Sequence, residues 1–304
     1  MKKDFLSVFA SCGDIQIKQN EGLAKYSTFK IGGKAKYALF PENKNALIFA
    51  VKACREFGMP YRIIGCGSNV LFDDEGFSGV IIFTKQINRT EVRGNLLYAE
   101  CGLPLTALCT LARSTSLAGL EFAFGIPGSV GGAVFMNAGA YGGEIKDILT
   151  EAEYYDIENE KLCTAPASEL ALGYRDSIFQ HKPYLILSAV FMLKAGNSAE
   201  IADKMTATMA ARRSKQPLEY PSAGSAFRRP AGYFAAKLID DAGLRGRSCG
   251  DAQVSEKHTG FIINRGNATS ADVTELCRII KKEVMERFGV SLETEFIHIK
   301  DCEK

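Results

Sequence analysis

Two glycine-rich segments are the clearest places where this chain could bind a ligand. The first, residues 65–69 (Gly-Cys-Gly-Ser-Asn), stands between two runs of strand-forming residues. Its glycines allow backbone N–H groups to turn toward a phosphate, and Ser68 or Asn69 can donate further hydrogen bonds. Val70 stands where Gly-x-Gly-x-x-Gly requires its last glycine, and a strand is predicted next, so this is not a Rossmann fingerprint. Taken alone, the segment fits a tight structural turn slightly better than a ligand loop.

The second segment, Gly125–Gly143, contains seven glycines in nineteen residues. Glycine weakens a helix or strand by roughly 0.5–1 kcal/mol per residue, so a compensating contact is expected. A long surface loop is the alternative, but Ile126, Val130 and Met136 make the segment too apolar for one. The pattern therefore predicts that this segment binds a flat or phosphate-bearing ligand.

Composition limits the number of domains and the kinds of partner. The chain has 304 residues, 46% of them hydrophobic, which favours two or three domains. Lys and Arg number 37 against 35 Asp and Glu, for a net charge of +2. No overall charge attracts a polyanion, so nucleic acid is not an expected partner.

Cysteine and histidine usage indicates no metal site and a reducing compartment. Nine cysteines and three histidines occur, without a Cys-x-x-Cys pair or a zinc-ligand order. We expect reduced, mostly buried thiols. The start Met1–Lys3 is followed by Asp4 and a short apolar run, which does not make a signal peptide, and no segment is long and apolar enough for a membrane span. The sequence therefore predicts a cytoplasmic protein that does not bind membranes.

Hydrophobic periodicity predicts the elements that would hold these segments. In the first two thirds we expect helices over Ala46–Phe57 and from Pro104 to near Gly119, with strands over Tyr61–Ile64, Val80–Phe83, Leu149–Ile157 and Tyr184–Leu193. Apart from these elements, irregular backbone is expected through Gly125–Gly143. Ser198 is predicted to cap a helix that runs to Lys215, where we place a domain boundary. Beyond it we expect a helix over Tyr233–Asp241, a strand over Gly260–Asn264, a helix capped by Ser270 and a closing strand over Leu292–Ile299.

Six motifs occur together in one order along the chain. They are Ser27–Gly33, Gly65–Leu71, Gly125–Gly143, Gly173–Phe179, Gly224-Ser225 and Glu256–His258. Together they resemble the UDP-N-acetylenolpyruvoylglucosamine reductase family from about Tyr26 to Ile299. Only 50 residues separate Arg175 from Ser225, which leaves little room for the tyrosine-bearing insertion of the longer subclass. The chain therefore resembles the short subclass, with a more open substrate site.

The resemblance implies an α+β fold with three domains. Residues 1–83 and 84–213 would form a two-subdomain FAD-binding module of the vanillyl-alcohol-oxidase type, and residues 214–304 a domain for the UDP-sugar substrate. NADPH would supply hydride through FAD, and UDP-N-acetylglucosamine enolpyruvate would become UDP-N-acetylmuramate, a peptidoglycan precursor. We expect the protein to act as a monomer.

Motif matching implies which residues hold FAD. They are Thr28, Ile31, Gly32 and Gly33 in the first segment; Gly65, Gly67, Ser68 and Asn69 in the second; and Gly125, Ile126, Pro127, Gly128, Ser129, Gly131, Gly132, Asn137, Ala138, Gly139 and Tyr141 in the third. Ile31 and Ile126 would pack against the flavin. Cys66 departs from the family pattern, where glycine is common, and its side chain could perturb the phosphate loop.

The resemblance also implies a catalytic set of Arg175, Ser225 and Glu295. In such a reduction, a cation can hold the enolate that develops beside the substrate carboxylate, and a hydroxyl can deliver the second hydrogen to so strong a base. Arg175 and Ser225 fit these two roles. Glu295 would orient Arg175 or, if protonated, hydrogen-bond the enolic oxygen, with Glu293 as the competitor for that position.

Charged residues near Ser225 suggest how the substrate could be gripped. Lys215, Arg228 and Arg229 could bind a diphosphate or carboxylate, although such residues are usually solvated. Arg229 stands where the family usually has asparagine, so the resemblance does not decide whether this residue contacts the substrate. For His258 we expect a packing or hydrogen-bonding role near the site rather than acid–base catalysis.

Two other functions are compatible with the same motifs. An FAD-dependent oxidase of the same superfamily would reduce its flavin from an organic alcohol and return the electrons to oxygen. A catalytically silent UDP-sugar-binding protein would keep the fold without turnover. Covalent flavin attachment through histidine, frequent among the oxidases, is not expected because no histidine lies in the glycine-rich segments. Arg175, Ser225 and Glu295 together argue against a silent protein.

Overall fold

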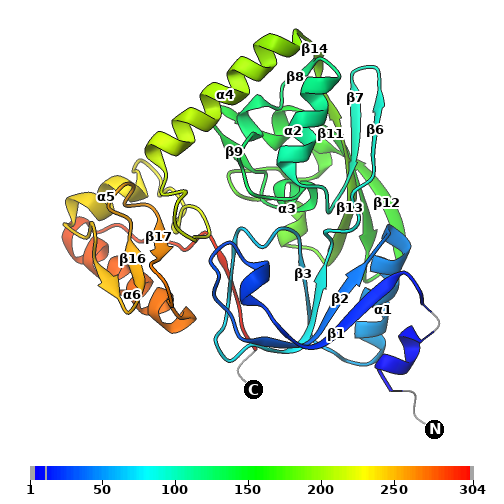
Figure 1. The fold of residues 1–304 in the computed structure, drawn as a ribbon, viewed down its shortest axis with the longest axis horizontal. Helices are drawn as coiled ribbons and strands as arrows, with labels where there is room; N and C mark the ends of the chain where they lie inside the picture. Colours follow the sequence, from blue (N-terminus) through cyan, green and yellow to red (C-terminus); the bar gives the residue numbers. More distant parts are fainter. Residues whose placement is uncertain (1–3, 11, 302–304) are drawn as a thin grey trace. The chain divides into compact units, whose positions relative to one another are not determined.

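The computed structural model describes residues 4–10 and 12–301, which form two compact units (Figure 1). Unit 1 comprises Met1–Lys18, Ala38–Cys66 and Val80–Ala211, and unit 2 comprises Gln19–Tyr37, Gly67–Gly79 and Arg212–Lys304. The start considered above as a signal peptide, Met1–Lys3, lies outside the described residues. No helix within the described ranges is long and apolar enough to cross a membrane.

A four-stranded sheet in the order β1-β2-β5-β3 is formed by strands from the first third of the chain. Its members are β1 (Ile15–Gly22), β2 (Lys34–Pro41), β5 (Phe77–Phe83) and β3 (Tyr61–Ile64). β3 runs parallel to β5, with Tyr61 opposite Val80. The prediction of both β3 and β5 is confirmed, although β5 begins three residues earlier than expected.

Helix α1 (Lys44–Glu56) confirms the helix predicted at Ala46–Phe57. It begins where the Asn43 side chain accepts a hydrogen bond from the Ala46 amide at 2.9 Å, which satisfies one of the free amides of the first turn. Leu47 and Val51 lie on its buried face. Lys44 also donates to the Tyr98 hydroxyl at 3.3 Å, which ties the start of α1 to the second sheet of unit 1.

The second sheet has five antiparallel strands in the order β12-β11-β13-β7-β6. These are β12 (Lys161–Pro166), β11 (Leu149–Asp156), β13 (Tyr184–Met192), β7 (Leu96–Glu100) and β6 (Thr90–Arg93). Strands β11 and β13 confirm the two predicted in this region. Helix α2 (Leu105–Ser114) was predicted to continue to near Gly119, which is wrong. Ser116 adopts a left-handed φ of 55°, and Leu117–Ala118 then pairs as β8 with β14 (Lys194–Ala195).

The second glycine-rich segment contains a helix that the sequence did not predict. Helix α3 (Val130–Phe135) starts at Ser129, whose side chain accepts a hydrogen bond from the Gly132 amide at 3.3 Å. Val130, Ala133 and Val134 are buried, and α3 packs on β13 and β7. Burial of these side chains and the cap outweigh the low helix propensity of two glycines. The expectation of irregular backbone throughout this segment was therefore wrong.

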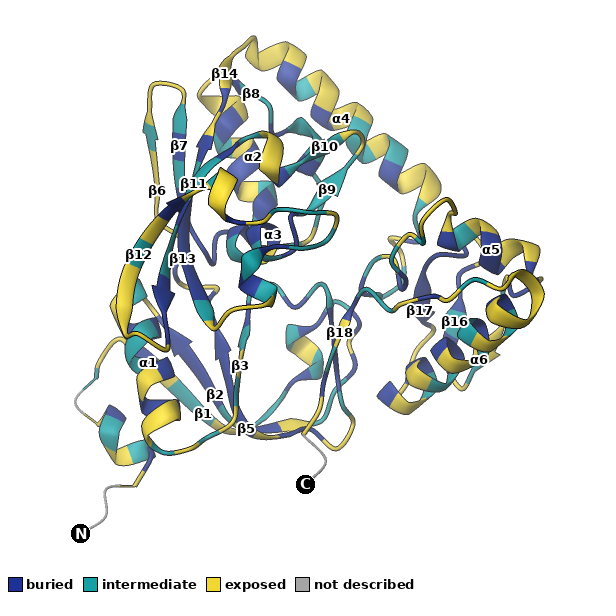
Figure 2. Cartoon of the chain, turned by 180° about the vertical axis from the view of Figure 1, so that it is seen from behind, coloured by how far each residue is buried: buried dark blue, intermediate teal, exposed yellow. Residues whose placement is uncertain are grey.

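The remaining elements of unit 2 form a small α+β assembly. They are α5 (Ala235–Asp241), the three-stranded sheet of β15 (Ser248–Cys249), β16 (Ala252–Val254) and β17 (Ile262–Asn264), and α6 (Ser270–Phe288). Helical spacing in the sequence predicts an inner face of α6 made by Val273, Leu276, Cys277, Ile280 and Val284, and all five are buried. Figure 2 shows buried and exposed residues along this helix. β18 (Ile297–Ile299) runs parallel to β4 (Val70–Phe72), with Ile297 opposite Val70.

Two predicted helix caps lie one residue too far along the chain. α6 is capped by Thr269, which forms a capping box with Asp272, while the Ser270 hydroxyl donates to Asp74 at 2.7 Å. In α4 (Ser198–Lys215) the Asn197 side chain accepts from the Ala199 amide at 2.8 Å. Both predictions chose a serine, and in both cases the preceding residue makes the cap.

The closing strand is shorter than the predicted Leu292–Ile299. Only Ile297–Ile299 pairs with β4. The preceding residues pair instead with another segment, since the Glu293 carbonyl accepts from the Arg228 amide at 2.9 Å and the Glu295 amide donates to the Ala226 carbonyl at 2.9 Å. This change of partner brings two of the sequence-predicted site segments together in unit 2.

Candidate functional site

The two glycine-rich segments meet in unit 1. A Cβ atom added to Gly65 would collide with the Ser129 hydroxyl, so the two residues are in direct contact. Within the described part of the chain, the backbone N–H groups of Gly65, Cys66, Gly128 and Ser129 donate to no acceptor. Backbone N–H groups that are left unpaired in this way can donate hydrogen bonds to an anion. These four groups are therefore candidate donors to a bound anion.

The first turn of α3 contributes less to such a site than its glycines suggest. The Val130 amide donates to the Leu103 carbonyl and the Gly131 amide to the Cys101 carbonyl, each at 2.8 Å. A Cβ on Gly131 would also lie only 2.9 Å from the Cys101 Cβ. Gly131 thus serves close packing against Cys101, and the available donors lie just before the helix.

Cys66 is compatible with an anion at this place. Burial raises the pKa of the Cys66 thiol, with a smaller opposing effect of Lys85. The thiol is therefore protonated near neutral pH, and no thiolate charge would repel a phosphate. Cys66 is also absent from the residues with positive φ, so this backbone position accepts a side chain.

In unit 2 the loop Thr28–Gly33 packs against residues 67–74. The Thr28 amide donates to the Gly67 carbonyl at 3.0 Å, and the Thr28 hydroxyl donates to the Ser222 carbonyl at 2.6 Å. A Cβ on Gly32 would lie 2.5 Å from the Phe72 Cβ, and one on Gly33 would collide with the Asp74 carbonyl. These two glycines of the predicted cofactor loop are required for its close packing against β4 and the residues that follow it.

Gly67 has two reasons to be glycine, which makes it a test position. Its φ is +65°, and a Cβ there would collide with the Tyr26 carbonyl. Gly58 has a similar φ of +61° but no atom within 4 Å of its Cβ position. Gly67→Ala is expected to lower the melting temperature and to reduce the amount of FAD that the protein retains. Gly58→Ala should lower the free energy of unfolding by only the roughly 1–2 kcal/mol that left-handed backbone costs a residue with a side chain.

Thermal melting and the flavin absorbance left after gel filtration measure these two effects. Gly58→Ala is the matched control for left-handed strain. Equal flavin retention by the two variants would contradict a specific need for close packing at Gly67.

The two isoleucines predicted to pack on a flavin have different environments. Ile31 is only 2% exposed and lies in the core of unit 2 with Leu71 and Phe227. Its side chain therefore belongs to that core. Ile126 is half-buried and its amide donates to the Ala123 carbonyl at 3.0 Å. Of the two, Ile126 has the more accessible side chain.

Asn137, another predicted cofactor residue, is completely buried. Its side-chain nitrogen donates to the Glu144 carboxylate at 2.7 Å and to the Gly173 carbonyl at 2.8 Å, while its side-chain oxygen accepts from the Lys146 amide at 2.9 Å. Both amide hydrogens are already used. The side chain therefore joins this segment to the turn that carries Arg175.

Arg175 lies in unit 1, in a turn closed by hydrogen bonds between Gly173 and Asp176. Its φ is 54°, the left-handed region that side chains rarely adopt. The guanidinium Nη2 donates to the Gly139 carbonyl at 3.0 Å, and the guanidinium carbon Cζ lies 5.3 Å from the centroid of the Tyr174 ring. Strained residues of this kind cluster at functional sites when the surroundings hold them in place.

Ser225 and Glu295 are brought together in unit 2. The Ala226 amide donates to the Gly260 carbonyl at 2.8 Å, and the Ala226 carbonyl accepts from the Glu295 amide at 2.9 Å. The Asn69 side chain donates to the Glu295 carbonyl at 3.2 Å. Ser225 is exposed and Glu295 half-buried. Three sequence-predicted residues from distant segments thus lie within one hydrogen-bonded group.

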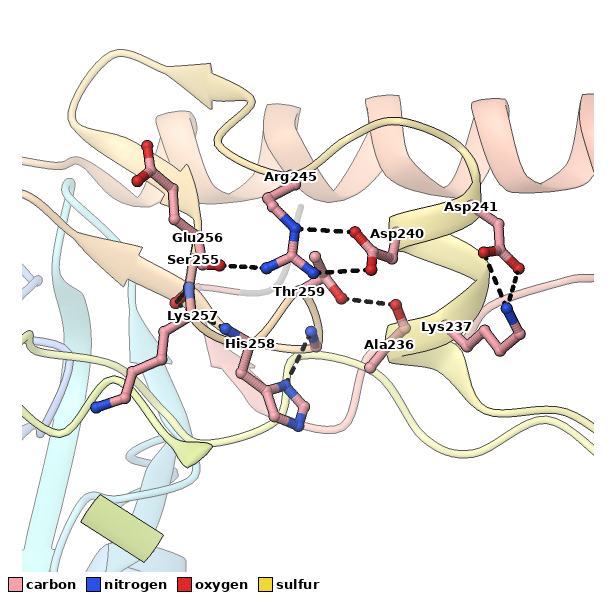
Figure 3. A network of polar contacts seen from close by, with 11 residues as sticks. Ala236, Lys237, Asp240, Asp241, Arg245, Ser255, Glu256, Lys257, His258 and Thr259 are labelled. Carbon is pink, nitrogen blue, oxygen red and sulfur yellow. Dashed lines mark hydrogen bonds and ion pairs between the residues drawn. The ribbon is translucent and has the colours of Figure 1, made fainter. Parts of the chain in front are cut away.

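A polar network fastens the Glu256–Gly260 turn to helix α5 (Figure 3). Arg245 makes a two-pronged contact with Asp240, at 3.0 and 2.7 Å, and also donates to the Glu256 carbonyl. The Thr259 hydroxyl donates to the Ala236 carbonyl at 2.6 Å. Forked guanidinium–carboxylate contacts fix orientation as well as distance. The network therefore sets the position of the Glu256–Gly260 turn, which pairs with Ser225-Ala226.

His258 lies in this turn with a defined tautomer. Its Nδ1 accepts a hydrogen bond from the Gly260 amide at 3.1 Å, which places the proton of the neutral ring on Nε2 (Figure 3). Burial lowers the pKa of His258, with a smaller lowering by Arg245 and an opposing backbone hydrogen bond. The ring also contacts Phe261 edge-on at 5.0 Å. A neutral, packed imidazole agrees with the predicted packing or hydrogen-bonding role.

The predicted substrate cations have separate surroundings. Lys215 is exposed at the end of α4 and Arg228 is half-buried. The Arg229 guanidinium lies 4.7 Å from the Phe234 ring, and that ring is 60% exposed. Phe234 lies within the predicted helix Tyr233–Asp241, and no motif in the sequence singled it out. Across the described residues, no three or more His, Cys, Asp or Glu are grouped to hold a metal ion.

Family models match two separate parts of the chain. A model described as an FAD binding domain matches residues 35–165. A model described as UDP-N-acetylenolpyruvoylglucosamine reductase, C-terminal domain, matches residues 216–299. The first range contains both glycine-rich segments, and the second contains Ser225 and Glu295.

Relatives match nearly the whole length. The UDP-N-acetylenolpyruvoylglucosamine reductase of Geobacillus kaustophilus (strain HTA426) is 45% identical over 284 residues, which is 93% of each chain. That of Clostridium novyi (strain NT) is 46% identical over 280 residues, or 92% of this chain and 91% of the relative.

Solved structures agree on the fold. The crystal structure of UDP-N-acetylenolpyruvylglucosamine reductase from Thermus caldophilus has a TM-score of 0.78 and 34% identity, covering 93% of this chain and 98% of that one. Berberine bridge enzyme from Eschscholzia californica has a TM-score of 0.50 at 17% identity, covering 64% and 44%. The chain therefore has the predicted α+β fold, with an FAD-binding module of the vanillyl-alcohol-oxidase type and a C-terminal α+β domain.

Proposed function

The chain belongs to the UDP-N-acetylenolpyruvoylglucosamine reductase family, and we propose that it reduces UDP-N-acetylglucosamine enolpyruvate to UDP-N-acetylmuramate with NADPH and FAD. The observation that carries this proposal is the hydrogen bond from the Glu295 amide to the carbonyl of Ala226, the neighbour of Ser225, in unit 2. It joins an exposed hydroxyl to a half-buried carboxylate through their main chains. Both are residue types that this reduction requires.

The FAD contacts proposed here come from each unit separately. In unit 1 the unpaired amides of Gly65, Cys66, Gly128 and Ser129 support binding of the cofactor diphosphate. The other predicted residues of Gly125–Tyr141 would surround it, with Asn137 acting through the backbone it positions. In unit 2 the close-packed glycines of Thr28–Gly33 and Gly67–Asn69 support further contacts. When bound, FAD supplies hydride transfer from NADPH to the enolpyruvyl methylene carbon.

The roles of the three catalytic residues follow from the charge that this reduction creates. Arg175 would stabilise the negative charge beside the substrate carboxylate, because its guanidinium keeps its charge and is already oriented by Gly139. Ser225 would donate its hydroxyl proton to the substrate carbon that becomes basic, and its exposure leaves it accessible. Glu295, rather than the exposed Glu293, would hydrogen-bond the enolic oxygen.

Substrate binding would use Lys215, Arg228 and Arg229, whose charges suit a diphosphate or carboxylate. Arg229 already stacks on Phe234, an arrangement that an asparagine could not make. We propose that the reaction serves peptidoglycan-precursor synthesis in the cytoplasm, with the protein acting as a monomer of three domains, residues 1–83, 84–213 and 214–304. Buried free thiols such as Cys54, whose pKa burial raises to about 12, suit a reducing compartment.

An anaerobic visible spectrum tests cofactor, donor and acceptor in one experiment. The purified protein would show the oxidised-flavin band, NADPH would bleach it, and UDP-N-acetylglucosamine enolpyruvate would restore it. Restoration by oxygen but not by the sugar would favour the FAD oxidase. Sugar binding without any bound flavin, even after reconstitution with FAD, would favour the catalytically silent protein and contradict the proposal.

A further inference from the structure

Gln180 hydrogen-bonds to Arg175, although it lies just outside the Gly173–Phe179 motif. It ends a short 3₁₀ helix, Ile178–Gln180, five residues after Arg175. Its side-chain nitrogen donates to the Arg175 carbonyl at 3.0 Å and to the Phe135 carbonyl at 2.9 Å. A glutamine side chain has two amide hydrogens, so both are accounted for.

The Phe135 carbonyl is a suitable anchor. It belongs to the last residue of α3, where carbonyl groups have no donor within the helix. The Ser177 hydroxyl, from a fully buried residue, also donates to it at 2.7 Å. Gln180 thus connects the main chain of Arg175 to the end of a packed helix, at a point fixed by a second buried hydrogen bond.

Arg175 needs such an anchor because of its backbone. Its φ of 54° is unfavourable for a residue with a side chain, and such conformations persist only where several contacts impose them. Asn137 fixes the start of the turn through the Gly173 carbonyl. Gln180 binds the Arg175 carbonyl directly.

We propose that Gln180 is the positioning residue for Arg175, holding its main chain in the left-handed conformation and thereby fixing where the guanidinium lies. The inference rests on the proposed function, in which Arg175 stabilises the charge that develops on the substrate. Small displacements of a charge-stabilising group cost rate without removing the group. Loss of the Gln180 donor should therefore act on the step that uses Arg175 and on no other.

The test uses FAD-loaded full-length protein with Gln180→Met, which keeps the side-chain length but removes the donor. We expect flavin reoxidation by the enolpyruvyl sugar to slow by about 10-fold, within the loss that a misplaced group can cause. Flavin reduction by NADPH should stay within about 2-fold, since no bond to Gln180 bears on it. Gln180→Lys, which restores a donor of similar reach, should recover most of the rate.

Gln253→Met is the matched control. Gln253 is also half-buried, and its side chain also donates to a carbonyl, that of Gly246 at 3.1 Å. Unlike Gln180, it lies in unit 2. This variant should leave reoxidation unchanged. Thermal melting of each apoprotein reports any loss of folding. If Gln180→Met does not fold, Gln180→Lys and Gln180→Asn are compared instead. The lysine variant should keep the rate of flavin reoxidation, and the asparagine variant, whose side chain is shorter, should lose it. Equal rates in the two variants would overturn the inference.

A double-mutant cycle separates positioning from general destabilisation. In an Arg175→Ala background, Gln180→Met should cause no further slowing, because the group it positions is gone. An equal additional loss there, or a parallel fall of both half-reactions, would overturn the inference. If Arg175→Ala slowed flavin reoxidation but Gln180→Met did not, the positioning role of Gln180 would be overturned while the role of Arg175 would stand. Normal reoxidation by Arg175→Ala itself would refute the proposed role of Arg175, and the positioning role with it.

Discussion

Replacing Ser225 by alanine is expected to slow flavin reoxidation by UDP-N-acetylglucosamine enolpyruvate by roughly 10²–10⁴-fold, the range for loss of a positioned proton donor. Flavin reduction by NADPH should change little, because that half-reaction needs no proton on the substrate. The backbone around Ser225 is held by Gly260, Phe261 and Glu295, so removal of one exposed oxygen should not move it. Anaerobic stopped-flow absorbance measures the two half-reactions separately.

Ser222→Ala is the control for this prediction. Ser222 precedes the same segment, and it accepts a hydrogen bond from the Thr28 hydroxyl through its carbonyl rather than its side chain. It should reoxidise at the normal rate. If Ser225→Ala lost both half-reactions equally, Ser225 would have a structural role and the proton would come from another group.

Arg175→Lys is expected to slow the same reoxidation step by about 10²–10³-fold, the usual effect of losing one preorganised electrostatic contact. Lysine keeps the positive charge but not the planar guanidinium, whose Nη2 donates to the Gly139 carbonyl at 3.0 Å. Charge alone should therefore not restore the rate. The kcat for the sugar should fall more than its KM rises, since the contact strengthens as charge develops.

Arg93→Lys provides the matched change elsewhere in unit 1. The Arg93 side chain is exposed and pairs with Glu91 at 2.6 and 2.9 Å, so this variant should behave as the parent. A normal kcat in Arg175→Lys would mean that a cation is sufficient there and that the orientation by Gly139 has no catalytic effect.

Regular elements with strong periodicity were predictable from the sequence. The buried face of α6 follows from apolar residues at helical spacing, and β3, β11 and β13 follow from short runs of strand-forming residues. The caps were each missed by one residue because several neighbouring side chains can accept the same hydrogen bond. Only the fold decides that Ser270 binds Asp74 while Thr269 caps the helix.

The glycine-rich segments show where sequence reasoning stops. Their composition indicated a ligand loop, but helix α3 depends on burial of Val130, Ala133 and Val134 against the second sheet, a contact made between distant segments. The family resemblance pointed to Arg175, Ser225 and Glu295. It did not indicate the left-handed backbone of Arg175, the buried side chain of Ile31, or the hydrogen bonds of Gln180, because these depend on partners that only folding brings close.

Unit 2 is assembled from three separate stretches of sequence, which has a consequence during synthesis. Phe29, Ile31 and Leu71 are made early, yet they belong to the same hydrophobic cluster as Val273, Leu276 and Ile280 of α6. Until the ribosome has produced the last third of the chain, these early side chains lack the core in which they are buried. A nascent chain that stalls before residue 212 should expose them to chaperones, and a fragment consisting only of residues 214–304 should fold poorly for want of the same three side chains.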